Sequence, residues 1–223
     1  MNTASPRLHP CGTGALLMDV AAGAFDLAAQ QRLWTLCREE GALAALPGVR
    51  EVVLGVNNVL VTFDPLQADP RALGEALRQA WDEAVPWEGQ GRLVEVPVTY
   101  DRSAEFDLSL VAGHAGMEID EVIALHTSTE VRVACVGWVP GFVYLVGLPK
   151  ALWTPRRATP RGQVPPGSVG IGGSQTGIIP MALPSGWNLL GRTELSLFDP
   201  HRAEPALFAP GDRVRFVCRG VVS

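Results

Sequence analysis

The feature that most limits what this chain can fold into is a stretch rich in glycine and proline, from residue 137 to residue 193. These 57 residues hold 11 of the 24 glycines and 8 of the 18 prolines in the sequence. Proline removes a backbone donor and glycine is costly inside a helix, so the stretch does not suit a regular helical layer. Short strands joined by long ordered loops tolerate both residues. The stretch therefore predicts a β-barrel.

The first 92 residues have the pattern of a small α/β domain. Their apolar spacing predicts a strand, a helix, a hairpin and a second helix, at residues 15–20, 24–45, 49–63 and 70–85. Pro47-Gly48 is expected to stop the first helix, and Asp69 to cap the second. Asn57-Asn58 suits the tight turn of the hairpin. We interpret this part as a ferredoxin-like domain.

A polar, turn-rich segment at residues 86–91 predicts a linker, and we place the domain boundary near residue 92. Beyond it we expect a strand at 93–98 and helices at 105–114 and 119–128, the second capped by Asp120 or a neighbour. The chain is thus predicted to be α+β, with domains at 1–92 and 93–223.

Composition excludes several classes of partner. The net charge is −5 and Lys150 is the only lysine, which argues against nucleic-acid binding. No apolar run approaches the roughly 20 residues that span a bilayer, and no secretory signal pattern is visible, so we expect a cytoplasmic protein without membrane contact. Neither zinc nor disulfides are indicated, because the cysteines are widely spaced: Cys11, Cys37, Cys135 and Cys218.

The stretch 137–193 also lacks aspartate and glutamate, although it contains Lys150, Arg156, Arg157, Arg161 and Arg192. Guanidinium groups bind carboxylate and phosphate through paired hydrogen bonds, and glycine lets backbone N–H groups approach an anion. The stretch therefore predicts an anionic ligand, with the glycine-rich segment 172–177 as a possible cradle. The alternative is that the glycines shape barrel corners while the arginines are solvated or pair with distant carboxylates.

Standard catalytic motifs do not appear in this stretch. Lys150 lacks the upstream glycines of a P-loop, the segment 170–177 breaks the G-x-G-x-x-G spacing, and no G-x-S-x-G elbow surrounds a serine. His126 follows a helical run, where it is either a reactive group or an ordinary helix-terminal histidine. Five aromatic residues are candidates to line a small-molecule pocket: Trp138, Phe142, Tyr144, Trp153 and Trp187.

Several ordered blocks together resemble a known family, that of the 5-oxoprolinase B subunit, also called allophanate hydrolase subunit 1 or the Kip-type histidine-kinase inhibitor. The blocks are Gly137-Trp-Val-Pro-Gly-Phe-Val-Tyr-Leu145, Pro155-Arg156, Pro160-Arg161, Val164-Pro-Pro-Gly-Ser-Val169, Gly172-Gly-Ser-Gln-Thr-Gly177, Gly186-Trp187, Gly191-Arg-Thr193 and Leu197-Phe-Asp199. The resemblance covers nearly the whole chain. It implies a small α/β domain followed by a cyclophilin-like β-barrel.

The resemblance also implies an activity, the ATP-dependent hydrolysis of 5-oxoproline to glutamate. The partners that it implies are the A and C subunits of the complex, and the C subunit is a relative of allophanate hydrolase subunit 2. Magnesium bound to ATP needs carboxylate oxygens. We expect them from flanking residues such as Glu130 or Glu194, or from another subunit, which we favour. This chain is then expected to hold no metal of its own and to be inactive alone.

By the same resemblance, we predict three catalytic residues: His126 as acid, base or hydrogen-bond donor, Gln175 as an orienting amide and Arg192 as an anion anchor. His126, Gln175, Thr176 and Arg192 are expected to face one pocket, with Arg156 and Arg161 near its mouth. The residues predicted to bind substrate or anion are Arg156, Arg161, Gly173, Thr176 and Thr193.

Two positions depart from the family pattern. Ile179 stands where a tyrosine is expected, and Ser185 stands where a glycine is expected. Two other functions stay open: an inhibitor that binds a sensor histidine kinase, and a carboxyltransferase-like subunit that acts on amides of the urea or allophanate type.

Overall fold

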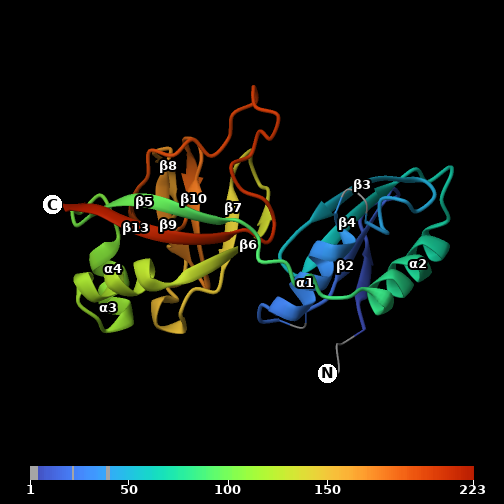
Figure 1. Ribbon diagram of the computed structural model, residues 1–223, viewed down its shortest axis with the longest axis horizontal. Helices are drawn as coiled ribbons and strands as arrows, with labels where there is room; N and C mark the ends of the chain where they lie inside the picture. The colour runs from blue at the N-terminus through green and yellow to red at the C-terminus, as the bar shows by residue number, and fades with distance from the viewer. Residues whose placement is uncertain (1–4, 22, 39–40) are drawn as a thin grey trace. The chain divides into compact units, whose positions relative to one another are not determined.

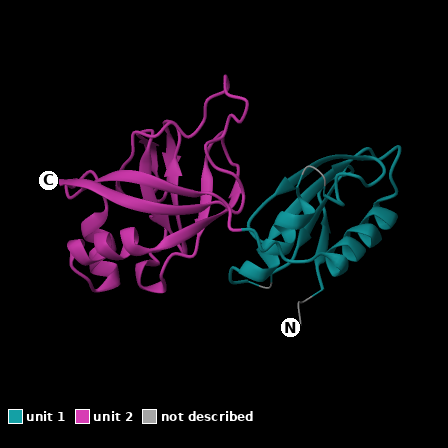
Figure 2. Cartoon of the chain, in the orientation of Figure 1, with its two compact units in different colours: residues 1–89 teal, residues 90–223 magenta. Residues whose placement is uncertain are grey.

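The structure, a computed structural model, describes residues 5–21, 23–38 and 41–223. The chain forms two compact units, residues 1–89 and residues 90–223, which Figure 2 colours separately. The boundary expected from the sequence, near residue 92, falls within three residues of this division. None of the helices in the described ranges is long and apolar enough to cross a membrane.

Unit 1 is a four-stranded antiparallel sheet with two helices. In chain order its elements are β1 (Arg7–Pro10), β2 (Ala15–Asp19), α1 (Leu27–Leu36), β3 (Val49–Leu54), β4 (Asn58–Phe63) and α2 (Pro70–Glu83). The strands lie in the order β1-β2-β4-β3. Alternate residues of β2 and β4 point into a core that both helices cover, including Met18, Val59 and Val61. The expected strand, hairpin and second helix are confirmed.

Strand β1 was not expected from the sequence. The elements from β2 to α2 follow the order of a ferredoxin-like unit, but its fourth strand is supplied by β1, from the N-terminal side. Pro10 lies in β1, and a proline usually indicates a loop in a sequence, so the strand was missed. An edge strand tolerates proline because only one side of it pairs. Here Arg7 pairs with Asp19 of β2 through the backbone register and an ion pair of 2.7 Å.

Helix α1 is shorter than the apolar spacing predicted. It ends at Leu36, where the backbone N–H of Cys37 bonds the carbonyl of Leu33. Leu43 lies beyond the helix but is fully buried in the same core, so it continues the apolar spacing from a turn. The prediction that the helix reaches residue 45 was therefore wrong. Helix α2 begins as expected, because Asp69 accepts a hydrogen bond from the N–H of Arg71 at 3.0 Å.

Unit 2 is built around a closed barrel of seven strands, which confirms the predicted β-barrel and the α+β class (Figure 1). Around the barrel the strands are β10 (Gln175–Ile179), β7 (Val143–Val146), β6 (Glu130–Val136), β13 (Arg213–Val222), β5 (Leu93–Asp101), β12 (Asn188–Arg192) and β9 (Ser168–Gly172). A separate two-stranded sheet pairs β8 (Arg161–Val164) with β11 (Leu183–Ser185). A short 3₁₀ turn, η1, spans Lys150–Leu152.

Two helices complete the barrel core. Helices α3 (Leu108–Ala115) and α4 (Ile119–Ser128) pack side by side against the barrel (Figure 1). Their buried residues, such as Val111 and Val122, belong to the same cluster as the barrel interior. Helix α4 begins after Glu118, whose N–H donates to the Glu121 carboxylate at 2.8 Å, so the capping residue is a neighbour of Asp120.

A line of polar groups crosses this core. Thr176 Oγ1 donates to the carbonyl of Gly170 at 3.0 Å, and therefore accepts from His126 Nε2–H at 3.1 Å. His126 Nδ1 then accepts from the Tyr100 hydroxyl at 2.7 Å. The imidazole also stacks on Phe216, with ring centroids 4.3 Å apart. Each polar atom of the line is satisfied inside the protein when the histidine is neutral.

We predict that His126 makes the barrel unit less stable in acid. Burial lowers the pKa of His126 to about 3, whereas an unfolded histidine has a pKa near 6.5. Between these values the unfolded state binds one more proton. The stability contribution is therefore complete above about pH 6.5 and falls by about 1.4 kcal/mol per pH unit below it.

Urea unfolding from neutral pH to about pH 4.5 would measure this slope. The variant His126→Gln keeps a polar side chain but has no titrating ring, so its free energy of unfolding should fall less steeply with acid. Equal pH slopes for the two proteins would contradict the prediction.

Candidate functional site

A buried carboxylate, Asp107, organises the arginines of the glycine-rich stretch. Its side chain is only 5% exposed and accepts from Arg157 Nη1 at 2.7 Å and from Arg161 Nη1 at 2.8 Å. Arg161 Nη2 gives a further bond at 3.0 Å, and the backbone N–H of Leu189 another at 2.8 Å. We call this arrangement the Asp107 clamp.

The clamp corrects the expected charge pattern. Arg161 was predicted to bind substrate or anion, but its guanidinium is paired with Asp107, as is that of Arg157. The balancing acid lies outside the stretch, about 50 residues away in sequence. Three cations of the stretch have no carboxylate within ion-pair distance among the described residues: Lys150, Arg156 and Arg192.

The glycines at 172–177 seat an aromatic ring. They form the tight β9–β10 hairpin, in which Gln175 pairs with Gly172. A Cβ at Gly172 would approach the indole of Trp187 to 2.8 Å, and one at Gly177 would approach it to 3.0 Å. The Gly173 N–H donates to the Thr154 carbonyl at 2.8 Å, so it is not free for an anion. The proposed cradle therefore lacks Gly173 as a backbone donor.

Trp187 forms part of a pocket of about 340 Å³ that we call the aromatic pocket. Its apolar wall rests on a small buried cluster that includes Phe142, whose ring meets those of Trp138 and Trp187 edge-on. Arg156 lies at this pocket with its guanidinium carbon 5.9 Å from the centroid of the Trp187 ring. The described lining residues include no carboxylate. The pocket thus combines flat apolar walls with an uncompensated cation.

Two hydroxyl groups add polarity to the aromatic pocket. Burial raises the pKa of Tyr144, opposed in part by Arg156, so the phenol is protonated at neutral pH and can donate. Ser185 Oγ accepts from the N–H of Trp187 at 3.2 Å, and its own proton has no acceptor assigned to it in the described residues. Ser185 does not have a positive φ, so serine fits here without backbone strain although the family pattern has glycine.

Trp138 holds an unusual backbone conformation at the edge of this pocket. Its φ is 65°, in the left-handed region that non-glycine residues rarely adopt, and its side chain is 56% exposed. The loop is tight, because the Gly137 N–H donates to the Phe142 carbonyl at 3.0 Å. Strained residues of this kind concentrate at ligand sites. The other family departure, Ile179, is buried in the apolar cluster behind the pocket.

Arg192 and Thr193 line a different pocket, of about 360 Å³, which we call the Arg192 pocket. Arg192 Nη2 donates to the Pro166 carbonyl at 3.2 Å, and Glu194 lies on the same wall. Thr193 is buried, and its Oγ1 accepts from the N–H of Leu195 at 3.3 Å. The two pockets share no lining residue among those described. Arg156 and Arg192 therefore do not belong to one small anion site.

The other predicted residues do not join either pocket. His126 and Thr176 meet inside the barrel, 1% and 0% exposed, so the expectation that they face an open pocket was wrong. Gln175 is partly exposed at the start of β10, and the linings of the three pockets described here do not include it. The structure brings His126 together with Thr176, and Arg192 with Thr193, but it does not gather them around one pocket with Arg156.

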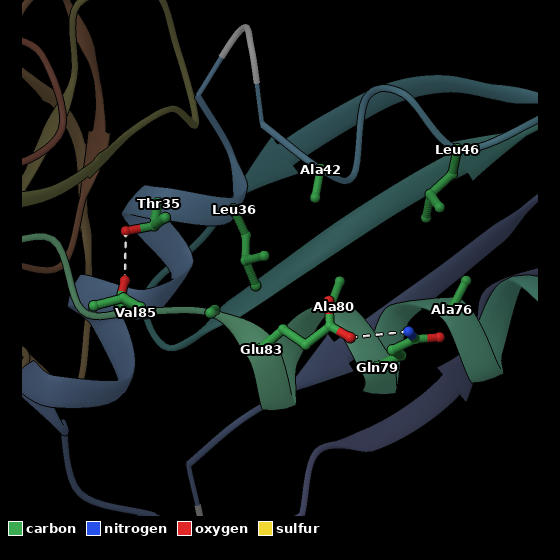
Figure 3. A pocket seen from close by; sticks show the side chains of 10 residues that line it. Thr35, Leu36, Ala42, Leu46, Ala76, Gln79, Ala80, Glu83 and Val85 are labelled. Atoms are coloured by element: carbon green, nitrogen blue, oxygen red, sulfur yellow. Dashed lines mark hydrogen bonds between the residues drawn. The ribbon is translucent and has the colours of Figure 1, made fainter.

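A third pocket, of about 550 Å³, lies in unit 1 between α1 and α2 (Figure 3). Its lining is largely aliphatic, with alanines along α2 and Leu36 on α1. Its polar groups already bond one another: Thr35 Oγ1 donates to the Val85 carbonyl at 2.8 Å, and Gln79 to Glu83 at 2.9 Å. With a carboxylate and no cation in its described lining, this pocket does not suit an anionic ligand.

The two carboxylates suggested for magnesium lie in different surroundings. Glu130 pairs with Arg213 and Arg215, at 3.6 Å each, and Glu194 lies in the Arg192 pocket. Within residues 5–21, 23–38 and 41–223, no group of three or more His, Cys, Asp or Glu side chains is placed to hold a metal ion.

Sequence reasoning missed Asp107 and the role of the glycine hairpin. Asp107 falls inside the helix predicted at 105–114, although α3 begins only at Leu108, and nothing local indicates two arginine partners. The paired Pro-Arg motifs marked Arg156 and Arg161 but not Arg157, and Gly186-Trp187 marked the indole. What no motif could show is which arginine is neutralised.

We predict that Asp107→Asn destabilises the barrel unit by about 3 kcal/mol, because it leaves two partly buried guanidinium groups, on side chains 32% and 21% exposed, without a carboxylate. Asp120→Asn is the matched control: Asp120 pairs with Arg102 but is 75% exposed, so its loss should change the free energy of unfolding by less than about 1 kcal/mol. Urea unfolding of both variants measures this difference. Similar losses in the two would show that the clamp is not a stabilising element.

Comparison with known proteins identifies the family of this chain. The family model for the carboxyltransferase domain, subdomains C and D, matches residues 6–208. The 5-oxoprolinase B subunit of Escherichia coli O157:H7 is 47% identical over 215 residues, which is 95% of each chain. That of Haemophilus influenzae is 43% identical over 192 residues, covering 86% of this chain and 88% of its own.

Solved structures give the same fold. The crystal structure of TTHA0988 matches with a TM-score of 0.76 and 34% identity, over 92% of this chain and 39% of that longer chain. The urea carboxylase of Kluyveromyces lactis matches with a TM-score of 0.81 at 20% identity, over 98% of this chain and 22% of its own, a likeness of fold alone. From the matched family model and the sequence relatives together, the chain belongs to the family of 5-oxoprolinase B subunits, within the carboxyltransferase C and D subdomain group.

Proposed function

We propose that this chain is the B subunit of an ATP-dependent complex that hydrolyses 5-oxoproline to glutamate. The observation that carries the proposal is the 47% identity to a 5-oxoprolinase B subunit, which extends over 95% of both chains. The site geometry is compatible with it. A small cyclic carboxylate is an anion with an apolar ring, and the barrel unit offers a cation without an acid partner, Arg156, beside aromatic walls.

The chemistry requires more than this chain supplies. A lactam carbonyl is a poor electrophile, and ATP supplies the phosphoryl group that turns its oxygen into a leaving group. The uncompensated cations lie apart, and the described residues hold no metal cluster. We therefore infer that the A and C subunits complete the site and carry the nucleotide with its magnesium. This chain binds and orients an anionic group, and is inactive alone.

Among the predicted catalytic residues, Arg192 keeps its proposed role as an anion anchor, because its guanidinium is exposed and has one protein acceptor in the structure. Gln175 remains a proposal as an orienting amide. His126 contributes through the barrel core: it is neutral, fully enclosed and held between Tyr100 and Thr176. We propose that it positions strand β10 and does not itself transfer a proton to a ligand.

We predict that phosphate release from ATP is stimulated by 5-oxoproline only when the chain is combined with its A and C partner subunits. The chain alone should give no stimulated release. A colorimetric phosphate assay with each subunit left out in turn measures this. If the complete complex shows no stimulation by 5-oxoproline, the alternatives of a kinase inhibitor or of another amide substrate take precedence.

We also predict that Arg192→Ala lowers turnover of the complete complex by at least about tenfold, since a charge-assisted hydrogen bond to an anion contributes about 1.5–3 kcal/mol. The fold should be intact, because the side chain is exposed and makes one backbone contact. Turnover is measured as glutamate formed, and thermal unfolding of the variant serves as the control. Near-normal turnover would show that Arg192 does not anchor an anion in the complex.

A further inference from the structure

We propose that the aromatic pocket is the binding site for the substrate, a small cyclic carboxylate, and that Arg156 is its carboxylate anchor. The choice of 5-oxoproline as the cyclic carboxylate rests on the proposed function. The location of the site does not, since it follows from the geometry of Arg156, Trp138, Trp187 and the Asp107 clamp. From the sequence, Arg156 was predicted to bind substrate or anion, but near the mouth of one pocket faced by His126, Gln175, Thr176 and Arg192.

The charges at the aromatic pocket single out Arg156. The Asp107 clamp neutralises Arg157 and Arg161, which leaves Arg156 as the one lining cation that no described carboxylate pairs with. A guanidinium presents two parallel N–H donors that match a single carboxylate. A triphosphate carries several negative charges and would need more cations than this pocket provides. The charge balance therefore favours a monocarboxylate over a nucleotide.

Trp187 restricts the orientation of Arg156. Arg156 lies over the indole of Trp187, at 5.9 Å from the ring centroid, and this contact limits where the guanidinium can point. Trp187 is itself fixed, because the backbones of Gly172 and Gly177 lie against its ring and Phe142 meets it edge-on. A cation held on a rigid surface loses less entropy when it binds an anion.

The other lining residues of the aromatic pocket match the ring of the ligand. A lactam ring has two flat apolar faces and one amide edge. Trp138 and Phe142 supply apolar walls, while the hydroxyls of Tyr144 and Ser185 supply donors for a carbonyl oxygen. The left-handed backbone of Trp138 keeps its large side chain at the pocket rim, at 56% exposure, where a ligand would cover it. The volume of about 340 Å³ is at the small end of ligand pockets.

The inference is tested by NMR titration of the full chain, following the indole N–H resonances of its six tryptophans. We expect 5-oxoproline to shift the resonances of Trp138 and Trp187, which Trp138→Phe and Trp187→Phe identify. The ring without its carboxylate, 2-pyrrolidinone, should bind at least about tenfold more weakly. ATP should not compete with 5-oxoproline for this pocket.

Arg156→Gln should weaken 5-oxoproline binding by at least about tenfold. Lys150→Gln is the matched control: it removes one positive charge from the same stretch, at an exposed residue that the pocket lining does not include, and should leave the affinity unchanged. Thermal unfolding confirms that both variants are folded. No shift with the unaltered chain, equal affinity for Arg156→Gln, or displacement of 5-oxoproline by ATP would overturn the inference.

The same variants in the complete complex separate the site from the function. Arg156→Gln should raise the KM for 5-oxoproline at least about tenfold, while Lys150→Gln should not. If the unaltered complex hydrolyses 5-oxoproline and Arg156→Gln has a normal KM, the site is wrong and the proposed function stands. If the unaltered complex is inactive but the isolated chain binds 5-oxoproline through Arg156, the site stands and the proposed function fails.

Discussion

The barrel unit depends on one buried charge, the Asp107 carboxylate. It joins the loop before α3 to the arginines at 157 and 161 and to the backbone of β12 at Leu189, segments that are far apart in sequence. A carboxylate of this kind is stable only because its charge is matched and both oxygens accept hydrogen bonds. Asp107 pairs with only two of the neighbouring arginines, Arg157 and Arg161. Arg156, which precedes Arg157 in the chain, is left without a carboxylate partner among the described residues.

Glycines in the same region make room for an aromatic ring because they have no side chain. Gly172 and Gly177 have no side chain where the Trp187 indole lies, so the ring packs against the β9–β10 hairpin itself. Gly141 serves a related purpose at the neighbouring loop, where φ is 79° and a Cβ would meet Phe198 at 2.8 Å. The glycines thus allow a rigid aromatic wall to form over the barrel, and Arg156 rests on that wall.

The sequence predicted the barrel and most local elements of the fold better than the pairings between residues far apart in the chain. The barrel followed from the density of glycine and proline, and α2 from the Asp69-Pro70 start. The length of α1 was overestimated because Leu43, which lies in a turn beyond the helix, is buried and continues the near-helical spacing of apolar residues. The cradle at 172–177 was misinterpreted because a glycine that admits a ligand and one that admits an indole have the same sequence. Asp107 could not be assigned, since an ion pair across about 50 residues leaves no local pattern.

The anion site that we propose at Arg156 fits the role of one chain in an enzyme of several subunits, which the subunit names of its relatives imply. The measurement that tests this account most directly is a crystal structure of the chain grown with 5-oxoproline. The account predicts the ring against Trp138 and Trp187, with its carboxylate within hydrogen-bond distance of Arg156 and the clamp unchanged. Ligand bound instead at Arg192, or an empty aromatic pocket at saturating 5-oxoproline, would contradict it.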